Sequence, residues 1–284
     1  MSDEVILEKD GVLVGPLRQP VNPAQQGSIH DDAVARKLGF RGGTIAGSIH
    51  MEQFPPLLLR AFGPRWYESG NLSLYFLNAT LDREPVRALV DLPPQGVTDA
   101  QVRLRMERED GMRVAEGSAS VGTPDEPSAL RRRLRELRAP GELRLLAGLE
   151  PGVTMGPRAA RIEPEQLRER LETITEPLPE YAEQDVVTPT LLVQLLRACE
   201  AELEGLRDTR GSTGLFGAIE TGWHGPVHAG RDYLASGKVL AVGDSPKTEY
   251  FWYESRLTAT DDERPLASMI MLLRFMKASS PLWA

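Results

Sequence analysis

The sequence predicts an α+β protein built from two similar halves, in each of which a long helix is followed by antiparallel strands. The segment GVLVGP at 11–16 recurs as GVTMGP at 152–157, with two substitutions. Each copy precedes an apolar helical pattern and then several strand-forming runs. At 284 residues the chain is long enough for two units of roughly 140 residues, each able to bury a core. The duplication is therefore the starting point for the assignment of elements.

Composition argues against several classes of protein. A formal net charge of −8 does not suit general binding to nucleic acid or to anionic membranes, since both require a basic face. There is no run of about 18 apolar residues, and the N-terminal MSDEVILEKDG lacks the apolar region of a secretory signal. The single cysteine, Cys199, excludes an internal disulfide and is expected in the core. We expect a cytoplasmic protein that binds neither nucleic acid nor membrane.

The first half begins with a short strand at 12–14 and a two-turn helix at 33–38. Asp31 or Asp32 can cap the start of this helix, and Gly39 can take the left-handed conformation that ends it.

A longer helix follows the Gly42-Gly43 turn, with an apolar stripe at Ile49, Phe54, Leu57, Leu58 and Ala61. Pro55-Pro56 interrupts it, so we expect a kink or a break restarted at Pro56. Strands are predicted at 71–78, 86–92, 102–106 and 112–121, the last two forming a hairpin around Asp110-Gly111.

The second half repeats this plan. Thr188 and Pro189 begin a long helix whose apolar face is predicted to extend to Leu206, and strands are expected at 214–222, 231–242, 247–259 and 264–276. The predicted organisation is a first unit at 1–122, a linker at 123–150 and a second unit at 151–284. The linker contains the basic run RRRLR at 131–135, which indicates a solvated connector or, alternatively, a docking patch for phosphate or an acidic carrier protein.

A long helix followed by antiparallel strands, occurring twice, is the layout of a double hotdog, in which each sheet wraps its own helix. The run 22–92 resembles the MaoC-like branch of hotdog proteins, above all in IHDD at 29–32, ARKLGF at 35–40 and RGG at 41–43. The pattern Phe62-Gly63-x-x-Trp66, followed by Gly70 and a strand, adds to the likeness. The resemblance implies a hydratase or dehydratase acting on an acyl thioester.

The same resemblance implies what the protein binds. Its ligand would be a small-molecule acyl group carried by coenzyme A or by an acyl carrier protein. Coenzyme A or phosphopantetheine would then be part of the substrate, and no separate cofactor is expected. A homodimer is the assembly that we expect.

His30 is the strongest candidate for a catalytic residue. The helix start that follows it disfavours imidazolium, whereas Asp31 and Asp32 favour it, so a neutral and orientable ring is expected. Such a ring can remove a proton next to a thioester carbonyl or activate water. The backbone amides from Gly43 to Gly47 could stabilise the enolate oxygen. A position of His30 away from any cavity would contradict this role.

One departure from the family pattern concerns the second catalytic group. In the hydratases that this chain resembles, an Asp precedes the His by five positions within Asp-x-Asn-Pro-x-His, and here that position is Gln25. Glutamine can orient water but cannot shuttle a proton. Three outcomes follow: Asp31 or Asp32 replaces the missing acid, His30 works alone, or hydration has been lost.

Other residues of the first half complete the candidate site. We predict that Gly43, Gly47, His50 and Trp66 bind substrate. His50 and Glu52 raise the alternative of a thioesterase with a helical carboxylate base, although residues two apart diverge by about 200° on a helix.

Metal and nucleotide chemistry have little support in the sequence. His224 and His228 lie among glycines and a proline without further ligands, so no metal site is expected. No phosphate-binding loop pattern is present.

The sequence thus predicts one working site, in the first half, with His30, Gln25 and Asp32 as its catalytic candidates. The second half acts as a structural partner whose long helix keeps only its apolar face. The favoured activity is that of a hydratase or dehydratase. The alternatives are a cyclase of a specialised biosynthetic pathway, a thioesterase, and a subunit that binds an acyl chain without catalysis.

Overall fold

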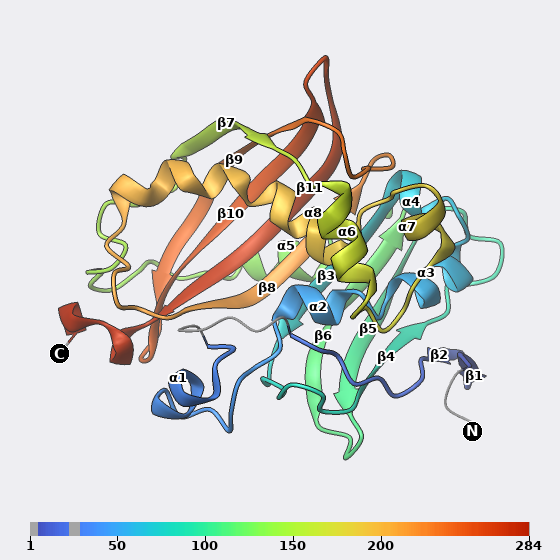
Figure 1. The fold of residues 1–284 in the computed structure, drawn as a ribbon, viewed down its shortest axis with the longest axis horizontal. Helices are drawn as coiled ribbons and strands as arrows, with labels where there is room; N and C mark the ends of the chain where they lie inside the picture. The colour runs from blue at the N-terminus through green and yellow to red at the C-terminus, as the bar shows by residue number, and fades with distance from the viewer. Residues whose placement is uncertain (1–4, 23–28, 284) are drawn as a thin grey trace.

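The computed structural model describes residues 5–22 and 29–283, and within them eleven strands form one continuous antiparallel sheet (Figure 1). The strand order is β1-β2-β4-β5-β6-β3-β8-β11-β10-β9-β7. The first half contributes β1 (Leu7–Lys9), β2 (Val12–Val14), β3 (Gly70–Phe76), β4 (Val86–Asp91), β5 (Ala100–Arg108) and β6 (Arg113–Val121). The second half contributes β7 (Thr154–Ala160), β8 (Gly214–Trp223), β9 (Tyr233–Asp244), β10 (Thr248–Ala259) and β11 (Asp262–Met276).

The order of the strands confirms the duplication. Read from each outer edge inward, β2-β4-β5-β6-β3 in the first half corresponds to β7-β9-β10-β11-β8 in the second. The repeated segments at 11–16 and 152–157 contain β2 and the start of β7, which hold equivalent places. The halves meet at the seam, the junction between β3 and β8, which pair from Asn71 opposite Gly222 to Tyr75 opposite Ala218.

Helices from both halves pack on the sheet. They are α1 (Asp32–Lys37), α2 (Gly47–Met51), α3 (Pro55–Phe62), α4 (Trp66–Ser69), α5 (Ala129–Leu134), α6 (Pro164–Leu171), α7 (Pro179–Glu183) and α8 (Pro189–Leu196), with 3₁₀ turns η1 (Ala198–Leu206), η2 (Lys277–Ser279) and η3 (Pro281–Trp283). Helix α3 packs on β2 and β4, and α8 packs on β9, β10 and β11. Helix α2 lies against both α8 and β8, near the middle of the molecule (Figure 1).

Both of the predicted long helices are interrupted. The first ends at Met51 and restarts as α3 with Pro55 at its first position, where the missing N–H breaks no helical hydrogen bond. The second was predicted to continue to Leu206: its α-helix ends at Leu196, and the segment from Ala198 to Leu206 is helical in 3₁₀ form as η1. Arg197 pairs with Glu200 at 2.7 Å, and this spacing of three residues favours 3₁₀ geometry, in which such side chains eclipse.

Local signals in the sequence correctly located most helix ends and turns. The Asp31 side chain accepts hydrogen bonds from the Ala33 and Val34 amides, and Gly39 ends the segment after α1 with φ 86°. The Thr188 side chain caps α8, and Gly111 takes φ 82° in the turn between β5 and β6. These ends depend on contacts between neighbouring residues, which explains why they could be predicted.

The segment 123–150, predicted as a linker, packs on the sheet. Leu130 of α5 is fully buried in a second cluster with Ala218 and Trp252, apart from the main core that contains Cys199. In the basic run, Arg131 pairs with Glu220 at 3.4 Å, and Arg132 and Arg133 also have acidic partners. In the described part of the chain, no helix is long and apolar enough to cross a bilayer.

Candidate active site

His30 is fixed by a hydrogen bond through one ring nitrogen. Its Nδ1 lies 2.6 Å from the carbonyl oxygen of Thr44, which can only accept, so Nδ1 carries the proton of the neutral ring. Nε2 is then the basic nitrogen. The half-buried ring lines a cavity, as the catalytic hypothesis requires.

The backbone around Gly43 holds the His30 segment in place. The Thr44 amide donates to the Ile29 carbonyl at 3.1 Å, and a Cβ on Gly43 would lie only 2.3 Å from the carbonyl oxygen of His30. Glycine is therefore required for this close approach of two chain segments. Gly43 acts here through its backbone and supports the histidine.

Asp32 supports the same loop. Its carboxylate accepts the Gly43 amide at 2.7 Å and pairs with Arg36 at 3.1 Å, and its side chain is exposed and lines neither of the cavities described below. Gln25 lies outside the described residues.

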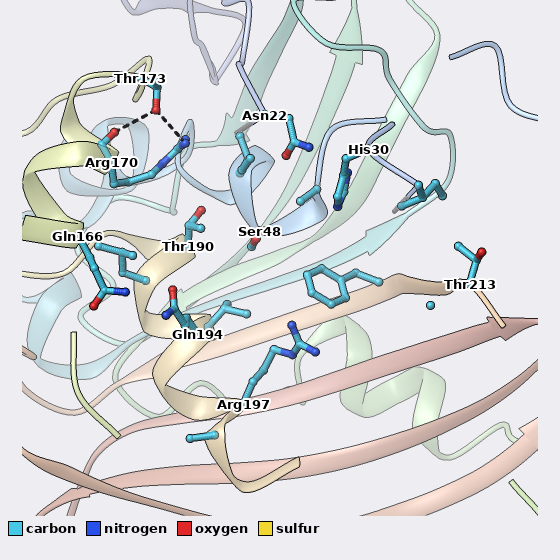
Figure 2. Close-up of a pocket in the computed structure, with 18 of the residues that line it drawn as sticks. Asn22, His30, Ser48, Gln166, Arg170, Thr173, Thr190, Gln194, Arg197 and Thr213 are labelled. Atoms are coloured by element: carbon cyan, nitrogen blue, oxygen red, sulfur yellow. Dashed lines mark hydrogen bonds between the residues drawn. The ribbon is translucent and has the colours of Figure 1, made fainter. Parts of the chain in front are cut away.

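Two cavities adjoin at His30. The larger has a volume of about 1160 Å³ and is lined by polar residues of both halves (Figure 2). The smaller, the inner cavity, has a volume of about 230 Å³ and includes the aromatic rings of Phe40, Phe76 and Phe216. The residues that line both are Ile29, His30, Ala46, Gly214 and Phe216. His30 thus stands between a large polar space and a small, more apolar one.

Gly47 and His50 of α2 line the inner cavity. A Cβ on Gly47 would lie 2.4 Å from the Phe76 ring, so glycine allows this ring to lie against the helix start. His50 bonds Thr80 Oγ1 through Nε2 at 2.8 Å, and its Nδ1 has no partner among the described residues. Burial lowers the pKa of His50 from 6.5 to about 4, so this ring is neutral near pH 7.

The second half contributes polar residues that sequence reasoning missed. Thr190, Gln194 and Arg197 line the larger cavity from α8 and its C-terminal end, across from His30 (Figure 2). Their spacing of four and three residues places them on one helical face. This pattern was present in the sequence, but the more numerous leucines of the same segment led to the prediction of an apolar face. The prediction that this helix keeps only an apolar face was wrong.

Unsatisfied polar groups mark the larger cavity. Thr190 Oγ1 and Asn22 Nδ2 are buried without a hydrogen-bond partner among the described residues, and both residues line the cavity. Buried polar atoms almost always have a partner, so these two can bind water or a ligand.

Glu52 is engaged in a buried ion pair between the two halves. Its carboxylate accepts from Arg170 Nε at 3.1 Å through both oxygens and also contacts Arg170 Nη2. The Glu52 side chain does not line either cavity. This placement disfavours the thioesterase alternative in which Glu52 is a free base.

Trp66, predicted to bind substrate, is placed in the core. It is fully buried, packs against Tyr67 and Trp223 with ring centroids 5.4 and 5.9 Å away, and lines neither cavity. Its bulk supports the seam between β3 and β8.

His224 and His228 have separate partners. His224 Nε2 lies 3.1 Å from Ser268 Oγ, and His228 Nδ1 lies 2.8 Å from the Gln184 carbonyl oxygen. Across residues 5–22 and 29–283, no three side chains of His, Cys, Asp or Glu are grouped to hold a metal ion.

The sheet wrapped around two helical segments and the cavity between the halves define a double-hotdog protein, which confirms the predicted fold. Solved structures agree. A Chloroflexus aurantiacus protein assigned as a MaoC domain dehydratase is similar with a TM-score of 0.58 and 13% identity, over 88% of each chain. A double-hotdog protein of Mycobacterium tuberculosis has a TM-score of 0.52 and 14% identity, over 87% of this chain and 85% of that one.

A third solved structure is also similar to this chain. The tesB protein of Mycobacterium avium subspecies paratuberculosis has a TM-score of 0.50 and 14% identity, over 94% of each chain. No protein-family model and no curated sequence matches this chain. At these identities the likeness establishes the double-hotdog fold.

Proposed function

We propose that this protein is a lyase of the hydratase or dehydratase type that acts on an acyl thioester, with His30 as general base and acid. The observation that carries the proposal is the position of His30 where the two cavities adjoin. The larger cavity has room for the arm of coenzyme A or of a carrier protein, and the inner cavity suits an acyl group. The carbons next to the thioester carbonyl would then lie beside the imidazole.

The chemistry requires one basic nitrogen. In dehydration, His30 Nε2 removes a proton from C2 of a 3-hydroxyacyl thioester, and that electron pair forms the C2–C3 double bond. The C3–O bond breaks, and the hydroxyl leaves as water with the proton returned by Nε2. Hydration is the reverse. The hydrogen bond from Nδ1 to the Thr44 carbonyl stabilises the imidazolium that forms in either direction.

The start of α2 would stabilise the enolate oxygen. The first N–H groups of a helix have no acceptor within it, and the Ala46 and Gly47 segment that begins α2 lines the inner cavity. Donors fixed in advance at the position where charge develops contribute strongly to catalysis.

The neighbouring acids have structural roles, which leaves the proton transfer to His30. Asp31 caps α1, and Asp32 bonds Gly43 and Arg36, so each has a role in the loop. Thr190 and Gln194, across the cavity, would orient the water or hydroxyl group without exchanging its proton.

Turnover of enoyl thioesters tests the proposal. Crotonyl and longer enoyl thioesters are incubated with wild type, His30→Ala and His30→Gln, and loss of the enoyl absorbance is followed. We expect both variants to be slower by about 10²- to 10⁴-fold, the usual contribution of a general acid–base group. His224→Ala is the control, because this exposed histidine lines neither cavity.

Other outcomes would assign a different function. Turnover that persists in both His30 variants would exclude this residue as the base. Release of free thiol would indicate a thioesterase, for which Glu169 is the only carboxylate among the described residues that line either cavity. Binding without turnover would favour an acyl-binding subunit, and conversion without loss of an enoyl group would favour a cyclase.

A further inference from the structure

The inner cavity lies where the two halves of the sheet part. Pairing between β3 and β8 ends at Tyr75 opposite Ala218, and beyond this point residues 76–79 and 214–217 line the cavity on either side. Arg274 of β11 lines the same cavity. Its Nη2 donates to Tyr75 Oη at 3.0 Å, so its side chain reaches from β11 to β3 across the open end of the seam.

A bulge in β8 makes room for the guanidinium. Leu272 pairs with Ala218 and Leu273 with Phe216, so Gly217 is an extra residue between them. A Cβ on Gly217 would lie 2.7 Å from Arg274 Nε. The absence of a side chain at this bulge lets the guanidinium lie over the backbone at the cavity.

The contacts of Arg274 within the described residues are all with neutral groups. Its Nη1 lies 3.3 Å from Thr248 Oγ1, Nη2 bonds Tyr75, and the guanidinium lies 5.1 Å from the centroid of the Tyr250 ring. No carboxylate in residues 5–22 or 29–283 lies within ion-pair distance of it. A guanidinium has five N–H donors in a planar fork that matches a carboxylate. Donors therefore remain for a ligand.

The charge of the inner cavity favours an anion. None of its described lining residues is Asp or Glu, and Arg274 is their only Lys or Arg. The two arginines of the larger cavity differ from Arg274, because each pairs with a carboxylate: Arg170 with Glu52 and Arg197 with Glu200. The lowered pKa of His50 keeps that ring neutral, so Arg274 is the group that an anionic ligand would meet there.

We propose that the substrate's acyl group carries a carboxylate at the end remote from the thioester, and that Arg274 binds it. This inference rests on the proposed function, since it assumes that the acyl group occupies the inner cavity. A carboxylate fits this position better than a phosphate of the carrier, because the carrier arm requires the larger cavity on the other side of His30. The substrate class is thus a monothioester of a short dicarboxylic acid.

Binding of saturated thioesters tests the inference without any turnover. Pentanoyl and glutaryl thioesters of coenzyme A have the same chain length and differ by the terminal carboxylate, and neither can be hydrated or dehydrated. Calorimetric titration of wild type should give a Kd for glutaryl that is about tenfold or more below that for pentanoyl, as a charge-assisted hydrogen bond provides. Arg274→Gln should reduce this preference by about the same factor.

Two further variants separate charge recognition from structural damage. Gly217→Ala displaces the guanidinium and should also reduce the preference. Arg256→Gln is the matched control on β10, since Arg256 bonds the neutral Ser236 hydroxyl at 3.1 Å and lines neither of the two cavities; it should keep the preference.

Several results would overturn the inference. Equal affinity of wild type for both thioesters would do so, as would a preference for glutaryl that survives in Arg274→Gln. If Arg274→Gln weakens both coenzyme A thioesters equally but leaves their N-acetylcysteamine counterparts unaffected, Arg274 binds the carrier phosphate and the inference fails. A failure of the proposed function alone would look different. Wild type would still bind the glutaryl thioester more tightly than the pentanoyl thioester, but it would not hydrate glutaconyl or 2-pentenoyl thioesters.

Discussion

The buried ion pair between Glu52 and Arg170 predicts a large and selective loss of stability. Glu52 is 1% exposed and Arg170 7%, and the pair joins the end of α2 in the first half to α6 in the second. Replacing Arg170 with Met leaves a carboxylate buried without a partner, which costs about 3–5 kcal/mol. At about 2–4 °C per kcal/mol for a chain of this size, the melting temperature should fall by roughly 6–20 °C.

Two comparisons isolate the ion pair in that experiment. Arg168→Met, on the same helix, removes an exposed pair with Glu165 and should change the free energy of unfolding by less than about 1 kcal/mol. The double variant Glu52→Met/Arg170→Met removes both charges and should recover most of the loss. With the single variant Glu52→Met added, urea unfolding of wild type, both single variants and the double variant gives the coupling energy of the pair. A cost for Arg170→Met equal to that for Arg168→Met would refute the reasoning.

Three other predictions follow from the site. The free energy of unfolding should decrease as the pH falls from 6.5 towards 4, by roughly 3 kcal/mol from His50 alone. The reason is that the folded pKa of His50, about 4, lies below its unfolded value, so the unfolded state binds more protons in this range. Urea unfolding at pH 7 and pH 5 should show a smaller difference for His50→Gln than for wild type. Gly43→Ala should cost about 1–3 kcal/mol and reduce enoyl-thioester turnover, because its Cβ would displace the His30 carbonyl, whereas Gly205→Ala, with open space around the Cβ, should do neither. Thr190→Val should lower kcat by about tenfold without loss of stability, since it removes an unsatisfied buried hydroxyl that we expect to hold water; an unchanged kcat would exclude that role.

The fold was largely predictable because its signals are local or repeated. Asp31 and Thr188 cap helices through neighbouring amides, and Gly111 turns the hairpin between β5 and β6. The repeated GVxxGP segment indicated that one plan occurs twice. The end of α8 was less predictable, because the contacts of Glu200 with Arg197 and with the distant Tyr253 hydroxyl are tertiary as well as local.

The site was predictable only in part. His30 was identified from its surroundings in sequence, and its cavity position follows from the Gly43 turn that fixes it. Trp66 resembled a site residue in its motif, but its burial against Trp223 depends on the pairing of β3 with β8, whose paired residues lie 143 to 151 positions apart in sequence. Arg274 has no distinguishing signal in the sequence, and its place at the inner cavity depends on contacts with Tyr75 of β3 and Thr248 of β10. Local sequence patterns do not show which residues of the two halves come together at the seam.

The duplication explains why a single cavity contains unlike residues from two like halves. The β3–β8 junction joins the two halves of the sheet, and α2 of the first half lies against α8 of the second. The first half then provides His30, and the second provides Thr190 and Gln194 opposite it. The second half therefore contributes polar side chains to this cavity as well as an apolar helix face to the core.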